Sequence, residues 1–221
     1  MRKLIIFGVG DAAELAYYYF STDSNYEVIA FTVDAEYIPT GNIFCGLPVI
    51  NFSNLPMNYG PENNSLFIAL GYSNVNKVRS EKYFSAKKMG YELASYVSSK
   101  ATILNKNQIG DNCFILENNT VQPFVLIGNN VTLWSGNHIG HHSQIGDHCF
   151  IASHVVISGR VIIGNSCFIG VNATFRDHLT IGSNCVIGAG VLMLSDASDN
   201  EVYMGIKAMP SRVPSHRLRH I

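Results

Sequence analysis

Large apolar residues recur at every sixth position along the second half of the chain. From Ile109 to Ile187, fourteen consecutive hexads each carry Ile, Val, Leu or Phe at this position, and Ile103 and Val97 extend the series backwards. Glycine follows the apolar residue in eight of the fourteen hexads. A period of six is too long for a single strand and does not match the helical period. The pattern therefore predicts short strands joined by sharp corners.

A longer period of 18 residues is superimposed on the hexads. The units that start at residues 109, 127, 145, 163 and 181 all begin with Ile-Gly. Three hexapeptides would then close one triangular coil, whose corners, rich in Asn and Gly, suit left-handed backbone angles. One coil cannot bury its own apolar residues. We therefore expect stacked coils, about 4.8 Å apart as in any sheet, that share one core.

Four cysteines occupy the fifth position of their hexads: Cys113, Cys149, Cys167 and Cys185. Their separations of 36, 18 and 18 residues place them in one interior column. A linear column cannot surround one ion tetrahedrally, so no metal site is expected. Disulfides are not expected in a chain without a secretion signal. We interpret these cysteines as small apolar core residues, whereas Cys45 carries no readable signal.

The first half of the chain lacks the hexads and alternates strand and helix patterns. Ten of the eleven tyrosines lie between Tyr17 and Tyr96, whereas all eight histidines lie at or after His138. Strands alternating with helices predict a small parallel α/β sheet. The expected strands are 4–7, 27–32, 66–70 and 92–97, and the expected helices are 11–20 and 74–89. We expect an α/β domain over 1–96, a repeat domain over 97–194 and a C-terminal tail over 195–221.

Composition limits the classes of function. Apolar residues make up 47% of the chain, which excludes general disorder, and the formal net charge of −1 argues against nucleic-acid binding. No apolar run approaches the roughly 18 residues of a membrane-spanning helix. The start, MRKLIIFGVGD, reads as a strand and a turn rather than as a signal peptide, because Asp11 interrupts its apolar run. We expect a soluble, cytoplasmic protein that does not bind membranes.

A glycine motif follows the first expected strand. Gly8, Gly10 and Ala13 satisfy the pattern Gly-x-Gly-x-x-Ala before a helix, and Asp34 ends the second strand, roughly where nucleotide-binding folds place a ribose-binding acid. Taken alone, this motif indicates a dinucleotide-dependent oxidoreductase. A first domain of 96 residues can hold only a truncated sheet, not both nucleotide-binding halves, so we disfavour that interpretation.

Taken together, these motifs resemble one group of enzymes. The hexad series with IGHHSQIGD and IGNSCFIGVNATF resembles the left-handed β-helix acyltransferases. The segments IIFGVGDAAEL and IALGYSNVNKVRS, with Asp34, narrow the resemblance to the bacterial nucleotide-sugar acetyltransferases, which include bacillosamine and perosamine N-acetyltransferases and sialic acid O-acyltransferases. The resemblance implies a Rossmann-like α/β domain followed by a left-handed parallel β-helix. It also implies a homotrimer that uses acetyl-CoA in cell-surface polysaccharide biosynthesis.

In that family a histidine followed by a glutamate acts as general base, and the resemblance assigns these two positions to His141 and His142. Imidazole titrates near working pH, so it can take the proton of an amine or hydroxyl that attacks a thioester. Because His142 replaces the glutamate, either Asp147 or Asp177 supplies the missing carboxylate or the base works unaided. The alternative interpretation is that both histidines are solvated corners of the coil.

The resemblance also implies the binding residues. Acetyl-CoA would lie between neighbouring subunits, at the coil positions Gly159, Val171 and Ala189. The nucleotide-linked amino sugar would lie in the first domain, at Gly8, Gly10, Asp34 and Gly71. Asp11 and Ala12 replace the Gly-His that usually follows the glycines, and Asp11 would repel a diphosphate.

Three functions remain open from the sequence. The first, which we favour, is an acetyl-CoA-dependent N-acetyltransferase that acts on an amino group of a nucleotide-linked sugar. The second is an O-acetyltransferase that acts on a sugar hydroxyl, as the sialic acid O-acyltransferases do. The third is a catalytically silent β-helix that serves as a binding module.

Overall fold

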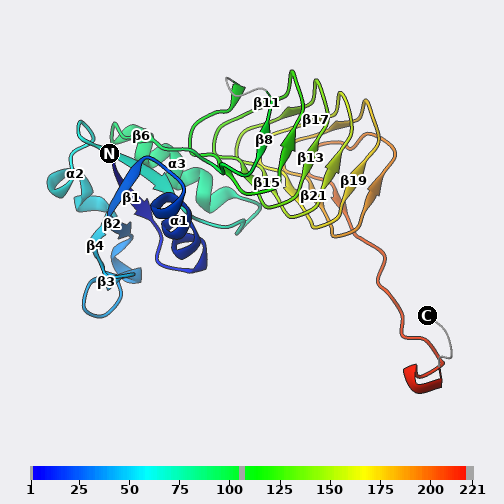
Figure 1. Ribbon diagram of the computed structural model, residues 1–221, viewed down its shortest axis with the longest axis horizontal. Helices are drawn as coiled ribbons and strands as arrows, with labels where there is room; N and C mark the ends of the chain where they lie inside the picture. Colours follow the sequence, from blue (N-terminus) through cyan, green and yellow to red (C-terminus); the bar gives the residue numbers. More distant parts are fainter. Residues whose placement is uncertain (1, 105–107, 218–221) are drawn as a thin grey trace.

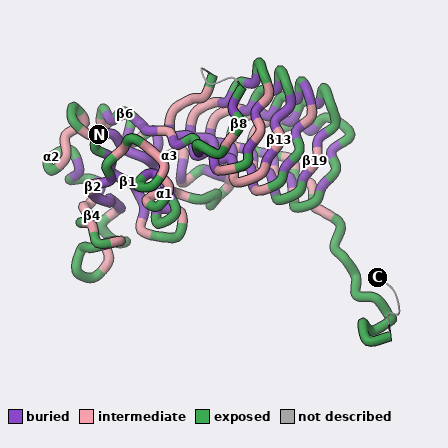
Figure 2. Tube along the Cα trace, viewed as in Figure 1, coloured by how far each residue is buried: buried purple, intermediate pink, exposed green. Residues whose placement is uncertain are grey.

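The computed structural model describes residues 2–104 and 108–217, which form two parts side by side (Figure 1). The N-terminal part, coloured blue through cyan to pale green, is a sheet with helices, and the second part, green to orange, is a stack of coils. Buried residues concentrate along the strands of the sheet and inside the coils (Figure 2). The C-terminal segment leaves the last coil and is exposed throughout residues 206–217.

Six strands form the N-terminal sheet, in the order β3-β4-β2-β1-β5-β6. Their bounds are β1 (Arg2–Phe7), β2 (Tyr26–Val33), β3 (Ile43–Phe44), β4 (Leu47–Asn51), β5 (Asn64–Ile68) and β6 (Glu92–Leu93). All neighbouring strands pair in parallel except β3 and β4, which form an antiparallel hairpin. The expected parallel α/β sheet is confirmed. The hairpin was not predicted, because β3 has only two residues and is too short to show an alternating pattern.

The helices of this part are α1 (Asp11–Thr22), α2 (Leu55–Asn58) and α3 (Lys77–Lys88), with the single turns η1 (Ala35–Tyr37) and η2 (Phe52–Asn54). On one face of the sheet, Phe20 of α1 shares a core with Leu4 of β1. On the other face, Tyr83 of α3 shares a core with Ile5 of β1. Successive side chains of a strand point to opposite faces, so the apolar run of β1 serves both cores.

The second part is a parallel β-helix built from three sheets. The first sheet contains β8 (Thr102–Ile103), β10 (Thr120–Val121), β13 (His138–Ile139), β16 (Val156–Ile157), β19 (Thr174–Phe175) and β22 (Leu192–Met193). The second contains β11 (Leu126–Ile127), β14 (Gln144–Ile145), β17 (Ile162–Ile163) and β20 (Thr180–Ile181). The third contains β7 (Tyr96–Val97), β9 (Phe114–Ile115), β12 (Thr132–Leu133), β15 (Phe150–Ile151), β18 (Phe168–Ile169), β21 (Val186–Ile187) and β23 (Val202–Tyr203).

The expected 18-residue coil is confirmed by the strand pairing. Ile127 pairs with Ile145, and Ile139 with Ile157, so that residues 18 apart stack on one another. The apolar residue of each hexad lies inside the triangle, and Ile139 is fully buried. The strand expected over 92–97 is divided, because β6 completes the α/β sheet whereas β7 pairs with β9 and begins the β-helix.

The corners between sheets form three edges along the β-helix. The first edge, which contains residues 140–143, joins the first sheet to the second. The second edge, which contains residues 146–149, joins the second sheet to the third, and the third edge, with residues 152–155, closes the triangle. Left-handed corners are not confined to Asn and Gly, because His142, Arg160 and His178 have φ values of 61°, 60° and 63°. At a corner, a large side chain can point away from the coil.

Two columns of side chains stabilise the second edge. The cysteine column (Cys113, Cys149, Cys167 and Cys185) is fully buried, which confirms the expectation for these residues. Next to it, the Asp147 carboxylate accepts a hydrogen bond from the Asn129 backbone N–H at 2.6 Å. The Asn165 side-chain oxygen accepts one from the Asp147 N–H at 2.8 Å. Each corner side chain thus satisfies a backbone donor of the neighbouring coil.

A buried arginine attaches the N-terminal part to the β-helix. Arg79 of α3 is only 1% exposed, and burial lowers the pKa of its guanidinium to about 10. The guanidinium donates hydrogen bonds to the backbone oxygens of Asn130, His148 and Cys149, which lie on the second edge. On the N-terminal side it donates to the Asn76 side-chain oxygen at 3.0 Å. The two parts are therefore held by polar contacts inside their interface.

After β23 the chain runs to the single turn η4 (Ser215–Arg217) away from both parts (Figure 1). Within residues 2–104 and 108–217, no helix combines the length and the apolar character that crossing a bilayer requires.

Candidate active site

His141 lies at the corner between β13 and β14, on the first edge. Its backbone N–H donates a hydrogen bond to the Gln122 side-chain oxygen at 2.9 Å, and its carbonyl accepts one from the Arg160 N–H at 2.9 Å. The next residue, His142, donates its N–H to the Pro123 carbonyl at 3.3 Å. Both imidazole side chains are exposed. Corners above and below therefore hold the backbone while the rings stay accessible.

The two imidazoles contact each other directly. Nδ1 of His141 and Nδ1 of His142 are 3.1 Å apart, and the rings are nearly perpendicular at 88°. The ring of His142 also packs on Phe124, with 4.7 Å between centroids. Partial removal from water, followed by the charges of Arg160 and His141, lowers the pKa of His142 below its usual value. These surroundings favour the neutral form of the His142 ring.

Gly159 lies one coil further along the first edge, against the ring of His141. A Cβ atom at this position would be 2.8 Å from Cε1 and 2.9 Å from Nε2 of His141. The glycine thus leaves the space that the imidazole occupies. The structure thus places His141, which the resemblance assigned to catalysis, next to Gly159, which it assigned to acetyl-CoA binding.

Neither carboxylate named from the sequence as a substitute for the missing glutamate pairs with His141. Asp177 lies on the first edge, but its Oδ1 accepts the backbone N–H of Gly159 at 2.8 Å. Asp147 lies on the second edge, in the ladder that includes Asn129. Within the described residues, no carboxylate forms a hydrogen bond or an ion pair with either imidazole.

The remaining two positions expected to bind acetyl-CoA lie on another edge. Val171 and Ala189 occupy corners of the third edge, and Val171 accepts a hydrogen bond from the Gly190 N–H at 2.8 Å. Val171 is 45% exposed. Within one chain, therefore, the structure does not bring Val171 and Ala189 beside His141 and Gly159.

Three of the four residues expected to bind the nucleotide sugar line one cavity of about 390 Å³: Gly8, Gly10 and Asp34. Gly8 has a φ of +131°, and a Cβ there would be 2.8 Å from the Ala69 carbonyl oxygen, so only glycine fits. The Asp34 carboxylate pairs with Nζ of Lys82 at 2.6 Å, and both side chains are mostly buried. Lys82 also lines this cavity. No sequence motif indicated Lys82, which reaches the site from α3.

Gly71, the fourth residue, lines a separate cavity of about 210 Å³ between the two parts. Asp11, Arg79 and Trp134 line it as well, and Leu70 borders both cavities. Asp11, which we expected beside the diphosphate, therefore lines the neighbouring cavity and not the cavity that Gly8 and Asp34 line.

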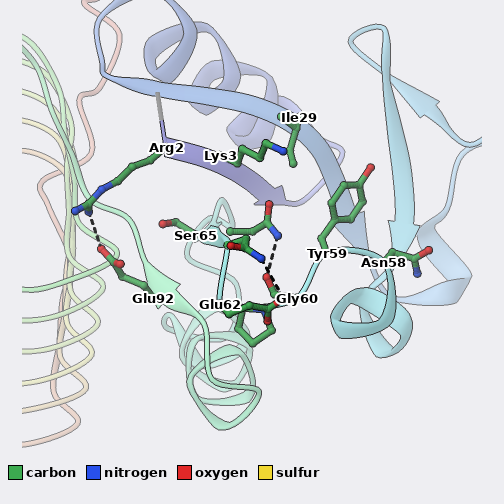
Figure 3. Close-up of a pocket in the computed structure, with 12 residues that line it drawn as sticks. Arg2, Lys3, Ile29, Asn58, Tyr59, Gly60, Glu62, Ser65 and Glu92 are labelled. Carbon is green, nitrogen blue, oxygen red and sulfur yellow. Dashed lines mark hydrogen bonds and ion pairs between the residues drawn. The ribbon is translucent and has the colours of Figure 1, made fainter.

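A larger hollow of about 820 Å³ lies at the opposite end of the sheet, and Figure 3 shows the side chains that line it. Arg2 and Lys3 of β1 and Ser65 of β5 line it, and Arg2 pairs with Glu92 at 3.1 Å. Ligands of parallel α/β sheets bind at the carboxyl ends of the strands, whereas this hollow lies at their amino ends. We therefore place the candidate nucleotide site at Gly8 and Asp34.

Comparison with known proteins agrees with this architecture. Residues 108–140, 124–159 and 160–194 match the model of the bacterial transferase hexapeptide family (six repeats). PerB from Caulobacter crescentus, solved in complex with CoA and GDP-perosamine, is 22% identical, with a TM-score of 0.82 over 93% of this chain and 95% of that one. No curated protein sequence matches the chain.

Two further solved structures have the same arrangement. The acetyltransferase domain of PglB from Neisseria gonorrhoeae FA1090, in complex with acetyl coenzyme A, is 22% identical, with a TM-score of 0.78 over 95% of this chain and 99% of that one. WeeI from Acinetobacter baumannii AYE is 20% identical, with a TM-score of 0.77 over 93% and 97% of the two chains. The chain therefore has the fold of these proteins, a Rossmann-like α/β domain followed by a left-handed parallel β-helix, and residues 108–194 match the hexapeptide repeat model.

Proposed function

We propose that this protein is an acetyl-CoA-dependent N-acetyltransferase that acts on the amino group of a nucleotide-linked amino sugar. The observation that carries the proposal is the exposed imidazole of His141 over Gly159, at a corner of a hexapeptide β-helix. The cavity lined by Gly8, Gly10 and Asp34 supports a nucleotide-linked acceptor. The similar fold of PerB, solved with CoA and GDP-perosamine, supports the same pair of substrates.

In the proposed reaction, the amine nitrogen attacks the carbonyl carbon of the thioester. Nε2 of His141 accepts the proton that the nitrogen loses, which makes His141 an imidazolium. The tetrahedral intermediate then breaks its C–S bond, and the departing CoA thiolate takes the proton from His141. The products are the N-acetyl sugar and CoA. Because the amine attacks directly, the transfer needs no cysteine nucleophile, in keeping with the buried cysteine column.

We also propose that the active unit is a cytoplasmic homotrimer that contributes to cell-surface polysaccharide biosynthesis. Gly159 lies on the first edge, whereas Val171 and Ala189 lie on the third, so a CoA molecule that reaches all three would contact two subunits. Sedimentation equilibrium at micromolar concentration is expected to give three times the chain mass of 24.3 kDa. A particle with the mass of one chain contradicts the shared site.

The function is tested by measuring thiol release from acetyl-CoA with a panel of nucleotide-linked amino sugars and their hydroxy counterparts. Release is expected with an amino sugar only, and His141→Ala is expected to lower kcat by about 10²–10⁴-fold, the range of general base catalysis. Preferential release with a hydroxy sugar would identify an O-acetyltransferase. Ligand binding without turnover of any acceptor would identify a binding module.

A further inference from the structure

We propose that His142 is a positioning residue: its Nδ1 accepts a hydrogen bond from Nδ1–H of His141 and so leaves Nε2 of His141 free to take the substrate proton. This inference rests on the proposed role of His141 as the general base. In the family that this chain resembles, a glutamate occupies the position of His142. Here a neutral imidazole would act as the hydrogen-bond acceptor.

The contact between the rings restricts their protonation states. A neutral imidazole carries one proton, on either Nδ1 or Nε2, and the other nitrogen is an acceptor. Because the two Nδ1 atoms are 3.1 Å apart, one of them donates and the other accepts. If His141 donates, its Nε2 has a free lone pair. If His142 donates, a neutral His141 carries its proton on Nε2 and cannot act as a base there.

The reaction itself selects the first arrangement. When His141 takes a proton on Nε2, it carries protons on both nitrogens and can only donate from Nδ1. The hydrogen bond between the rings then persists only if His142 is the acceptor. Since hydrogen bonds from a charged donor are stronger than neutral ones, this contact stabilises the imidazolium as it forms.

The surroundings of His142 keep it able to accept. The charged and titratable groups that act on it are Arg160 and His141, and with partial desolvation they lower its pKa and favour the neutral ring. Phe124 packs on that ring, with 4.7 Å between the centroids. Nε2 of His142 makes no hydrogen bond within residues 2–104 and 108–217, so it can carry the ring's single proton toward solvent.

The chain offers matched variants for a test. Phe124 occupies the corner one coil before His142 with a φ of 67°, so His142→Phe suits this backbone and keeps a ring without an acceptor. His142→Glu restores an acceptor. His178→Phe changes a corner of the same edge, with a φ of 63°, that does not contact His141, and it serves as the control.

The first measurement is the ¹⁵N NMR spectrum of labelled imidazoles in the full-length protein, which distinguishes the two tautomers without any activity. In the unmodified protein, His141 is expected as the Nδ1–H tautomer and His142 as the Nε2–H tautomer. In His142→Phe, His141 is expected to move to a mixture of both tautomers, whereas His178→Phe leaves its spectrum unchanged. The reverse tautomers in the unmodified protein overturn the inference.

The second measurement is the pH profile of kcat. His142→Phe is expected to lower kcat about 10- to 100-fold with little change in KM. It is also expected to move the midpoint of the acidic limb, where kcat rises with pH, to lower pH, because the imidazolium loses its acceptor. His142→Glu is expected to recover the rate and move the midpoint to higher pH. If acetyl transfer occurs but His142→Phe changes neither the profile nor the tautomer, the inference is wrong and the proposed function stands. If the tautomers are as expected but no acceptor is acetylated, the proposed function is wrong.

Discussion

Replacing Gly159 by alanine tests whether the space beside His141 is required for catalysis. The new Cβ would be 2.8 Å from Cε1 of His141, whereas carbon atoms in contact lie about 3.5–4.0 Å apart. The ring must therefore move by roughly 1 Å. Since a displacement of about 1 Å can cost on the order of 10²-fold in rate, we expect kcat to fall 10- to 100-fold in Gly159→Ala.

The stability of the same variant is expected to change little. Gly159 does not have a left-handed φ that would disfavour alanine, and the exposed His141 ring can move into solvent. Steady-state thiol release from acetyl-CoA gives kcat and both KM values, and thermal unfolding gives Tm. Gly60→Ala is the matched control, because the atoms nearest to its Cβ would be those of the flexible Glu62 carboxylate, in the N-terminal part.

Two results would refute this reasoning. The first is an unchanged kcat with a raised KM for acetyl-CoA, which would mean that Gly159 acts through the cofactor rather than through His141. The second comes from combining the variant with His141→Ala. If Gly159 acts by displacing the imidazole, its loss of rate disappears in the His141→Ala background, so an additive loss contradicts the model.

Three further predictions follow from buried or paired groups. At pH 8 in the native protein, a thiol reagent is expected to modify Cys45 at most, because the four thiols of the cysteine column are buried and inaccessible. Burial also raises the pKa of Cys113 to about 12, which keeps that thiol protonated. All five thiols are expected to react after denaturation, and rapid reaction of all five in the native protein contradicts the register of the hexads. Asp34→Asn is expected to raise KM for the nucleotide sugar about tenfold with little change in kcat, and a fall in kcat alone would assign Asp34 to the chemistry. Arg79→Met is expected to lower the free energy of unfolding by about 3 kcal/mol in urea, since several buried carbonyl groups lose their donor, and a loss below about 1 kcal/mol contradicts its role at the interface.

The repeat domain could be predicted closely from the sequence because its signal is local. Each hexad places one apolar residue inside the coil, so the order of strands and the burial of Ile139 follow from counting along the chain. The same count predicts that the four cysteines stack in one interior column. The first strand and helix of the α/β part were predicted for a similar reason, since the apolar run before Gly8 is long and the helical pattern after it is clear.

The contacts of the site could not be predicted, because they join residues that no period relates. Counting by 18 predicts that Asp177 lies on the same edge as His141. It does not predict that the Asp177 carboxylate accepts a hydrogen bond from the Gly159 backbone. The hydrogen bond between His141 and His142 depends on side-chain rotation, which sequence spacing does not determine. Lys82 reaches Asp34 across 48 residues, and Arg79 reaches Asn130 across 51.

The columns along the edges restrict how this chain can change in length. A deletion of six residues would move every later residue to the next edge of the triangle. The polar residues of one edge would then no longer stack on their hydrogen-bond partners in the neighbouring coil. A deletion of 18 residues keeps every column and shortens the stack by one layer of about 4.8 Å. We therefore expect the β-helix to tolerate insertions and deletions of whole coils. Coils added after His178 would lengthen the stack without moving the first edge at His141, whereas a coil added between Asn130 and His141 would carry that corner one layer further from Arg79.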